Sequence, residues 1–124
     1  MALTSSILTG TKKILGLEED YEAFDYDIIT HINSVFSRLK QLGIGPVEGF
    51  FIEDADATWD DFTIDRNEYN AVQSYMYLRV RLLFDPPQTS YLITSQQEQI
   101  TALEVQMNYD REDAEWTDPT IPLT

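Results

Sequence analysis

The segment Tyr75–Pro87, Tyr-Met-Tyr-Leu-Arg-Val-Arg-Leu-Leu-Phe-Asp-Pro-Pro, has the strongest structural signal in the chain, an apolar helical run that ends in two prolines. Pro86 and Pro87 lack the amide hydrogens that would continue a helix, and Pro86 disfavours helical dihedral angles at Asp85. The segment therefore predicts a helix that ends near Phe84, then a stiff corner and a second helix.

Helical periodicity continues on both sides of this corner. From Asn67 to Phe84 the apolar residues cover more than half of the helix circumference, which predicts a central helix with several neighbours. After the corner, Thr89 or Ser90 can cap a last helix that runs to about Asn108. One side of that helix has an apolar stripe for the core, formed by Leu92, Ile93, Ile100, Leu103 and Met107.

The opposite side of the last helix has a sparser apolar line, formed by Tyr91, Ala102, Val105 and Tyr109. A monomer has no reason to keep a second apolar face, so we interpret this line as a candidate contact surface. The alternative, that these are scattered exposed apolar residues, stays open at this point.

Two further helices are expected upstream. Phe24–Leu42 has apolar residues at helical spacing and is followed by Gly43, which is typical of a helix end. Carboxylates near its start favour the first turn; these are Asp20, Glu22, Asp25 and Asp27. Thr4–Leu15, interrupted by Gly10, predicts a shorter and weaker helix. The predicted fold is all-α, a small bundle of about four helices.

A long acidic loop separates the second and third main helices, at residues 44–65. Within it, Thr58 and Asp61 are spaced for a capping box, which predicts a helical turn that points Trp59 and Phe62 inward. These two aromatic residues either pin the loop to the core or form a subunit contact.

The two arginines of the central helix are not equivalent. Arg79 falls inside the apolar arc, whereas Arg81 falls on the polar side. A buried guanidinium costs several kcal/mol unless it is paired, so Arg79 is expected to meet a carboxylate in its own subunit or across an interface. Its side chain could instead reach the surface along apolar neighbours. Arg81 is expected in solvent or on a partner.

The chain has 124 residues, with 22 acidic against 8 basic side chains and a formal charge of −14. Its length fits one domain, expected at residues 1–109, followed by an acidic, proline-containing tail at residues 110–124 that is expected to be flexible in isolation. Trp116 could anchor this tail on a partner. The charge opposes binding to nucleic acid or to anionic membranes, and no segment is typical of a membrane span or an export signal.

Catalytic and metal-binding signals are weak throughout. The chain has no cysteine and one histidine, His31, so a thiol dyad and a multi-histidine metal site are excluded and a packing role is expected. Residues 54–65 copy the spacing of a calcium loop, but Trp59 occupies the position that requires glycine. We therefore expect no enzyme, no cofactor and no metal.

Three segments resemble the head-tail connector (adaptor, head-completion) proteins of long-tailed double-stranded-DNA bacteriophages, a family also described as phage DNA-packaging proteins. They are Tyr75–Pro87, Asp27–Asn33 (Asp-Ile-Ile-Thr-His-Ile-Asn) and Ala57–Phe62 (Ala-Thr-Trp-Asp-Asp-Phe). The resemblance covers roughly Thr4–Met107 and includes the order of the elements. It implies a structural protein, of phage or prophage origin, that forms a ring beneath the portal, expected to be twelvefold.

The same resemblance implies a place at the head-tail junction of the virion, reached from the host cytoplasm during assembly. The ring would dock on the portal during or after DNA packaging, and would offer a surface to a downstream head-completion or tail protein. DNA would pass through the acidic ring without specific binding. The expected interface residues are Trp59, Phe62, Arg79, Arg81, Tyr91, Val105, Tyr109 and Trp116, and the structural corner is Phe84, Asp85, Pro86 and Pro87.

A different class of function is compatible with the same charge. An acidic protein-binding module, such as a DNA-mimicking inhibitor, would bind a basic partner with steep salt dependence. A connector would use apolar contacts that survive moderate salt.

Overall fold

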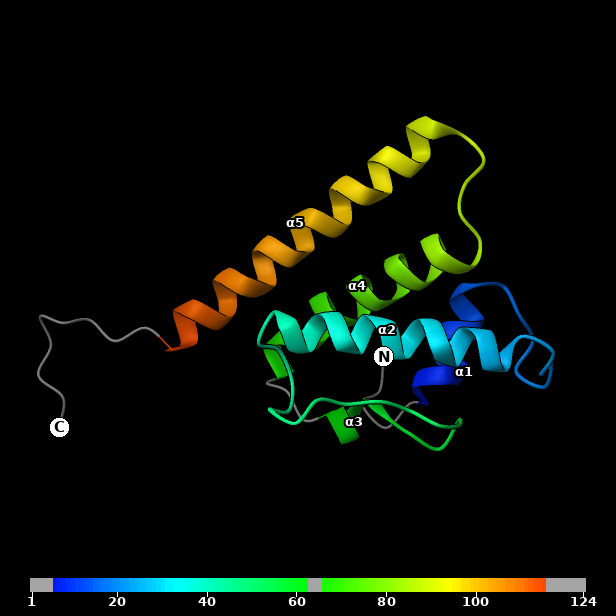
Figure 1. The fold of residues 1–124 in the computed structure, drawn as a ribbon, viewed down its shortest axis with the longest axis horizontal. Coiled ribbons are helices and arrows are strands. Elements are labelled where there is room, and N and C mark those ends of the chain that lie inside the picture. The colour runs from blue at the N-terminus through cyan, green and yellow to red at the C-terminus, as the bar shows by residue number, and fades with distance from the viewer. Residues whose placement is uncertain (1–5, 63–65, 116–124) are drawn as a thin grey trace, which may run out of the picture.

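The computed structural model describes residues 6–62 and 66–115, and these form an all-α bundle without β-strands, as the sequence predicts (Figure 1). The helices of these residues are α1 (Ile7–Ile14), α2 (Asp25–Gln41), α3 (Trp59–Phe62), α4 (Arg66–Phe84) and α5 (Ser90–Glu115). The long loop lies between α2 and α4, with α3 as a short helical turn inside it.

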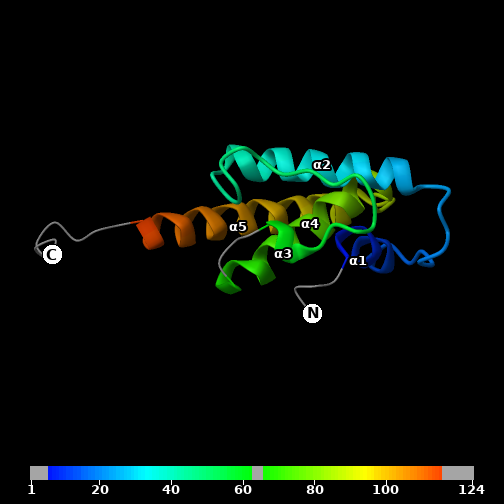
Figure 2. The ribbon, with the colours of Figure 1, turned by 90° about the horizontal axis from the view of Figure 1, so that it is seen from below.

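Helix α4 is the centre of the molecule, since α1, α2 and α5 all pack on it. In Figure 2, α2 lies on one side of the layer formed by α4 and α5, and α1 and α3 lie on the other. Helix α5 packs mainly on α4, and its C-terminal end projects beyond the other helices (Figures 1 and 2).

The core joins the apolar stripe of α2 to the wide apolar arc of α4. Ile32 and Leu39 of α2, and Val72, Tyr75 and Met76 of α4, have at most 1% of their surface exposed. Each fully buried side chain of this size contributes roughly 1.5–3 kcal/mol through removal of apolar surface from water. The central position that the sequence predicts for this helix is confirmed.

The acidic loop is fixed to the helices at several points. The Asn33 side chain exchanges two hydrogen bonds with the backbone of Ile52, with N–O distances of 2.9 and 2.7 Å. Gly45 has φ +92°, and a Cβ atom there would lie 2.5 Å from the Phe62 ring. The loop is thus a packed part of the domain.

The helical turn predicted inside this loop is present. Asp61 Oδ2 accepts a hydrogen bond from the Thr58 amide at 2.9 Å, which is the reciprocal bond of a capping box with Asp in place of Glu. The four residues that follow Thr58 form α3.

Local signals correctly predict where α4 and α2 end. Helix α4 ends at Phe84, directly before the Asp-Pro-Pro corner. Helix α2 ends at Gln41, and Gly43 follows with φ +80°, while the Ile44 amide donates to the Leu39 carbonyl at 2.9 Å. These are the left-handed turn and the backward hydrogen bond of a glycine-terminated helix.

The expected end of the last helix near Asn108 is wrong, because α5 continues to Glu115. Residues 109–115 contain no proline or glycine, so nothing local stops the helix there. The division into a domain at 1–109 and a tail at 110–124 therefore stays a prediction, and the tail residue Trp116 lies outside the described residues.

Candidate assembly interface

A cluster of charged side chains joins α5 to the rest of the bundle. Glu104 of α5 accepts hydrogen bonds at Oε1 from Arg38 of α2, from Nε at 3.0 Å and from Nη2 at 2.8 Å. Arg79 of α4 has its Nη1 atom 4.0 Å from the other oxygen of Glu104. The hydrogen bond and charge of Glu104 raise the pKa of Arg38. One carboxylate therefore links three helices.

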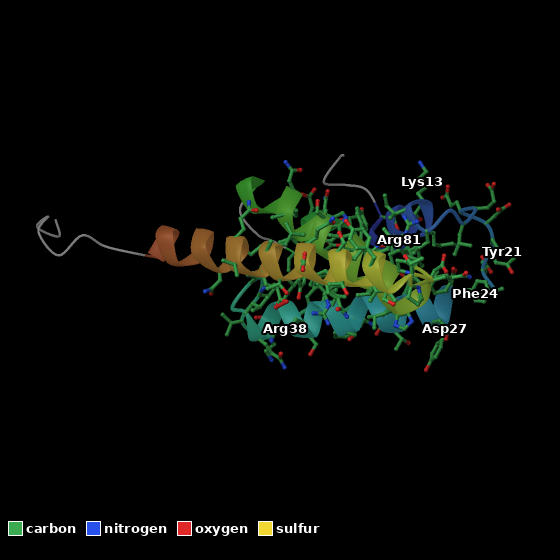
Figure 3. All side chains as sticks on the ribbon, turned by 90° about the horizontal axis from the view of Figure 1, so that it is seen from above. Lys13, Tyr21, Phe24, Asp27, Arg38 and Arg81 are labelled. Carbon is green, nitrogen blue, oxygen red and sulfur yellow. The ribbon has the colours of Figure 1, made fainter. Side chains whose placement is uncertain are left out.

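The carboxylate partner expected for Arg79 is thus Glu104 of the same subunit. Arg79 also donates to the Tyr75 hydroxyl at 3.1 Å, and its guanidinium carbon lies 5.6 Å from the centre of the Tyr75 ring. Its side chain is 28% exposed, so the guanidinium is paired and still reaches the surface. Arg81 is exposed, as expected, and lies toward α1 and Lys13, away from Arg38 (Figure 3).

Helix α5 shows both of the faces that its sequence predicts. Ile100 and Met107 are buried against α4, whereas Tyr91 and Val105 are 81% and 65% exposed. Leu92 differs from the prediction, because it is 48% exposed instead of belonging to the core. Because α5 packs mainly on α4, only part of the apolar stripe that its sequence predicts is covered by another helix.

Two open cavities flank the contact between α4 and α5. The first, here called the Tyr77 groove, has a volume of about 520 Å³ and is lined by Ser74, Tyr77, Leu78, Gln99, Ala102 and Leu103. The second, here called the Arg79 cavity, has a volume of about 420 Å³ and is lined by Arg79, Leu82, Leu83, Gln97, Ile100 and Thr101. The α4–α5 pair therefore presents apolar surface on both sides.

Comparison with protein-family models identifies the family of this chain. A family model described as phage connector protein matches residues 7–114, which include all but the last residue of the helices α1 to α5. The chain belongs to the phage connector protein family. Comparisons with curated proteins and with solved structures gave no match. Membership of this family indicates a structural role at the head-tail junction of a phage particle.

The connector buries the two loop aromatics in its own core. Trp59 and Phe62 are 0% and 1% exposed, and the ring centre of Phe62 lies 4.9 Å from that of Phe36. Their side chains therefore pin the acidic loop to the bundle, which is one of the two interpretations of the sequence. A contact of this loop with a neighbouring subunit stays a prediction.

The connector also has an aromatic cluster that the sequence analysis missed. Phe24 stacks edge to face on Phe84 at the proline corner, with ring centres 5.3 Å apart, and Tyr21 stacks on Phe24 at 5.8 Å. Tyr21 and Phe24 are 47% and 40% exposed and lie at the end of the molecule where α2 begins (Figure 3). The Tyr-Glu-Ala-Phe spacing before α2 is a signal for this contact, although its partner Phe84 is remote in sequence.

A buried cation at the start of the connector was missed as well. Lys12 is 2% exposed and forms an ion pair with Asp25 at 2.9 Å, while its Nζ donates to the Glu19 carbonyl at 2.8 Å. This pair ties the end of α1 to the first turn of α2. The sequence pattern indicates Asp25 only as a favourable charge near a helix start, and it gives no sign of the lysine that meets it.

The remaining predicted site residues can be placed only in part. Tyr109 belongs to α5, but its side chain and the whole of Trp116 lie outside what the structure describes. Among the side chains that the structure describes, no group of three His, Asp or Glu residues could hold a metal ion. No helix in the described part of the chain is long and apolar enough to cross a membrane.

Proposed function

We propose that this connector forms a homo-oligomeric ring at the head-tail junction, docks on the portal and offers the surface for tail completion. The match of the connector family model to residues 7–114 is the observation that carries this proposal. The ring is expected to be twelvefold, to join the portal during or after DNA packaging, and then to receive a downstream head-completion or tail protein.

The outer face of the α4–α5 pair is the surface best suited to these contacts. Tyr91 and Val105 are exposed on one face of α5, while Leu92 of α5 and Leu83 of α4 are exposed elsewhere on the pair. Large apolar side chains that recur along one helix face favour a partner that covers them. Arg81, exposed on α4, and the partly exposed Arg79 can add polar contacts at the rim of this surface.

The charge of the chain supports the role of a conduit. With a formal charge of −14 per subunit, a ring would repel the phosphate backbone, and DNA could slide through it without specific binding. The same charge makes free subunits repel one another, so ring formation should depend on apolar contacts and on the portal as a template.

Native mass spectrometry of the connector, alone and mixed with the portal protein of the same phage, tests this proposal at two salt concentrations. A portal-dependent ring stoichiometry that survives moderate salt is the expected result. A salt-labile one-to-one complex with a basic protein, and no complex with the portal, would instead support the acidic DNA mimic.

A further inference from the structure

The lining of the Arg79 cavity combines one cation with three apolar side chains and with the polar residues Gln97 and Thr101. Among the described residues, the guanidinium of Arg79 makes a single short contact, to the Tyr75 hydroxyl, and its nearest carboxylate oxygen on Glu104 is 4.0 Å away. A guanidinium has five N–H donors, so several remain for another acceptor. The apolar part of the lining comes from Leu82, Leu83 and Ile100. The cavity is suited to an apolar side chain next to a carboxylate.

Residues 116–124 of the chain have this chemistry. The segment, Trp-Thr-Asp-Pro-Thr-Ile-Pro-Leu-Thr, places Trp116 two residues before Asp118, and it follows an acidic stretch at residues 110–115. We infer that Trp116 and Asp118 of one copy bind in the Arg79 cavity of a second copy. Trp116 would fill the apolar part, and the Asp118 carboxylate would accept hydrogen bonds from Arg79.

The geometry of α5 favours a second copy over the same chain. Asp118 follows Glu115, the last residue of α5, by at most about 10 Å of extended chain. Thr101, the lining residue of α5 closest to its C-terminal end, lies about 21 Å back along the helix axis from Glu115. Trp116 directly follows Glu115, so it cannot fill the apolar part of the cavity of its own chain, and the end of α5 points away from the bundle (Figures 1 and 2).

The Tyr77 groove is a weaker candidate for the same segment. It is larger, but no charged side chain lines it, so it offers no partner to Asp118. A contact between two different surfaces of one chain is heterologous, which is the type that closes into rings. The inference thus rests on the proposed ring. It makes the neighbouring subunit, instead of the portal, the partner of the tail.

Cysteine cross-linking can test this contact cleanly, because the natural chain has no cysteine. One full-length variant carries Thr117→Cys and a second carries Gln97→Cys. The two variants are mixed, both without and with the portal protein, and the disulfides that form are mapped by mass spectrometry. We expect a disulfide between copies that joins positions 97 and 117. Ser34→Cys, at an exposed position of α2, replaces Gln97→Cys in the control mixture and should give little cross-link.

Two substitutions examine the charge contact within this experiment. Asp118→Asn and Arg79→Met should each lower the yield of the disulfide between positions 97 and 117 about fivefold, the loss for a partly exposed charge pair. Lys13→Met, which removes an exposed cation of α1, should leave the yield unchanged. If Arg79→Met disturbs the fold through Tyr75 and Glu104, Asp118→Asn alone decides, since it alters none of the described contacts.

Failure of this inference is distinguishable from failure of the ring. Portal-bound rings that form normally without the disulfide between positions 97 and 117, or that give it at the same yield after Asp118→Asn, would overturn the inference and leave the ring intact. A disulfide that joins position 117 only to the portal would overturn it in favour of a tail–portal contact. Absence of both rings and disulfide would overturn both proposals.

Discussion

Helices α2 and α5 both pack on α4, but they do so with different chemistry. Helix α2 buries five apolar side chains, of which Ile28, Ile32, Val35 and Leu39 are completely inaccessible. Helix α5 buries Ile100 and Met107 and adds the ion pair of Glu104 with Arg38. The difference shows that apolar packing holds the α1–α2–α4 body together, whereas α5 leaves much of its apolar surface uncovered.

The largest effect is expected in the body. Trp59→Ala should lower the free energy of unfolding by about 3–5 kcal/mol, because it empties a fully buried site between α3, α2 and α4. Urea unfolding followed by circular dichroism measures the change. Leu92→Ala, at a half-exposed position of α5, is the control and should lower the free energy of unfolding far less. Equal losses in the two variants would contradict the distinction between the α1–α2–α4 body and α5.

A smaller and more local effect is expected at the link between α5 and α2. Glu104→Gln should accelerate amide hydrogen exchange in α5 several-fold and leave the core of α2 nearly unchanged, because Arg38 and Arg79 lose their shared carboxylate. Hydrogen exchange followed by mass spectrometry measures both helices at once. Glu98→Gln, exposed on the same helix, is the matched control. Uniform acceleration in all helices would mean that α5 is not a separate unit.

Alkaline pH should weaken the body through the buried Tyr75 and the partly buried Tyr77. Burial raises the pKa of Tyr75 and Tyr77 above the usual value of about 10. As pH rises past about 10 the unfolded chain releases these protons first, so their contribution to stability is complete below that pH and falls above it. Unfolding titrations should show this decline, and Tyr75→Phe should flatten it. An unchanged slope in that variant would contradict the assignment.

The smallest effect on stability is expected on the exposed face of α5. Val105→Asp should change the free energy of unfolding by less than about 0.5 kcal/mol, since Val105 is largely in water. The same change should abolish portal-dependent rings by placing a charge in an apolar contact. Ser34→Asp adds the same charge on exposed α2 and should assemble normally. Normal assembly of Val105→Asp would exclude this face as the contact.

Sequence reasoning succeeds where the signal is local or periodic. The Asp-Pro-Pro corner ends α4 at Phe84, and the Thr58–Asp61 spacing locates α3. It fails for Leu92, whose spacing along α5 predicts a core position. Because α5 packs mainly on α4, Leu92 stays half-exposed. Sequence reasoning also sets the end of α5 too early, because an acidic composition without proline or glycine does not stop a helix.

The sequence by itself determined the helices, most of their ends and the strongly acidic charge of this protein, because prolines, glycines, caps and apolar spacing act within a few residues along the chain. The tertiary structure alone decided which remote groups meet. Glu104 is brought to Arg38 and Arg79, Phe24 to Phe84, and the α4–α5 pair is left with an open cavity on each side. Such pairings depend on how whole helices pack, and no local pattern encodes the side chain that lies opposite.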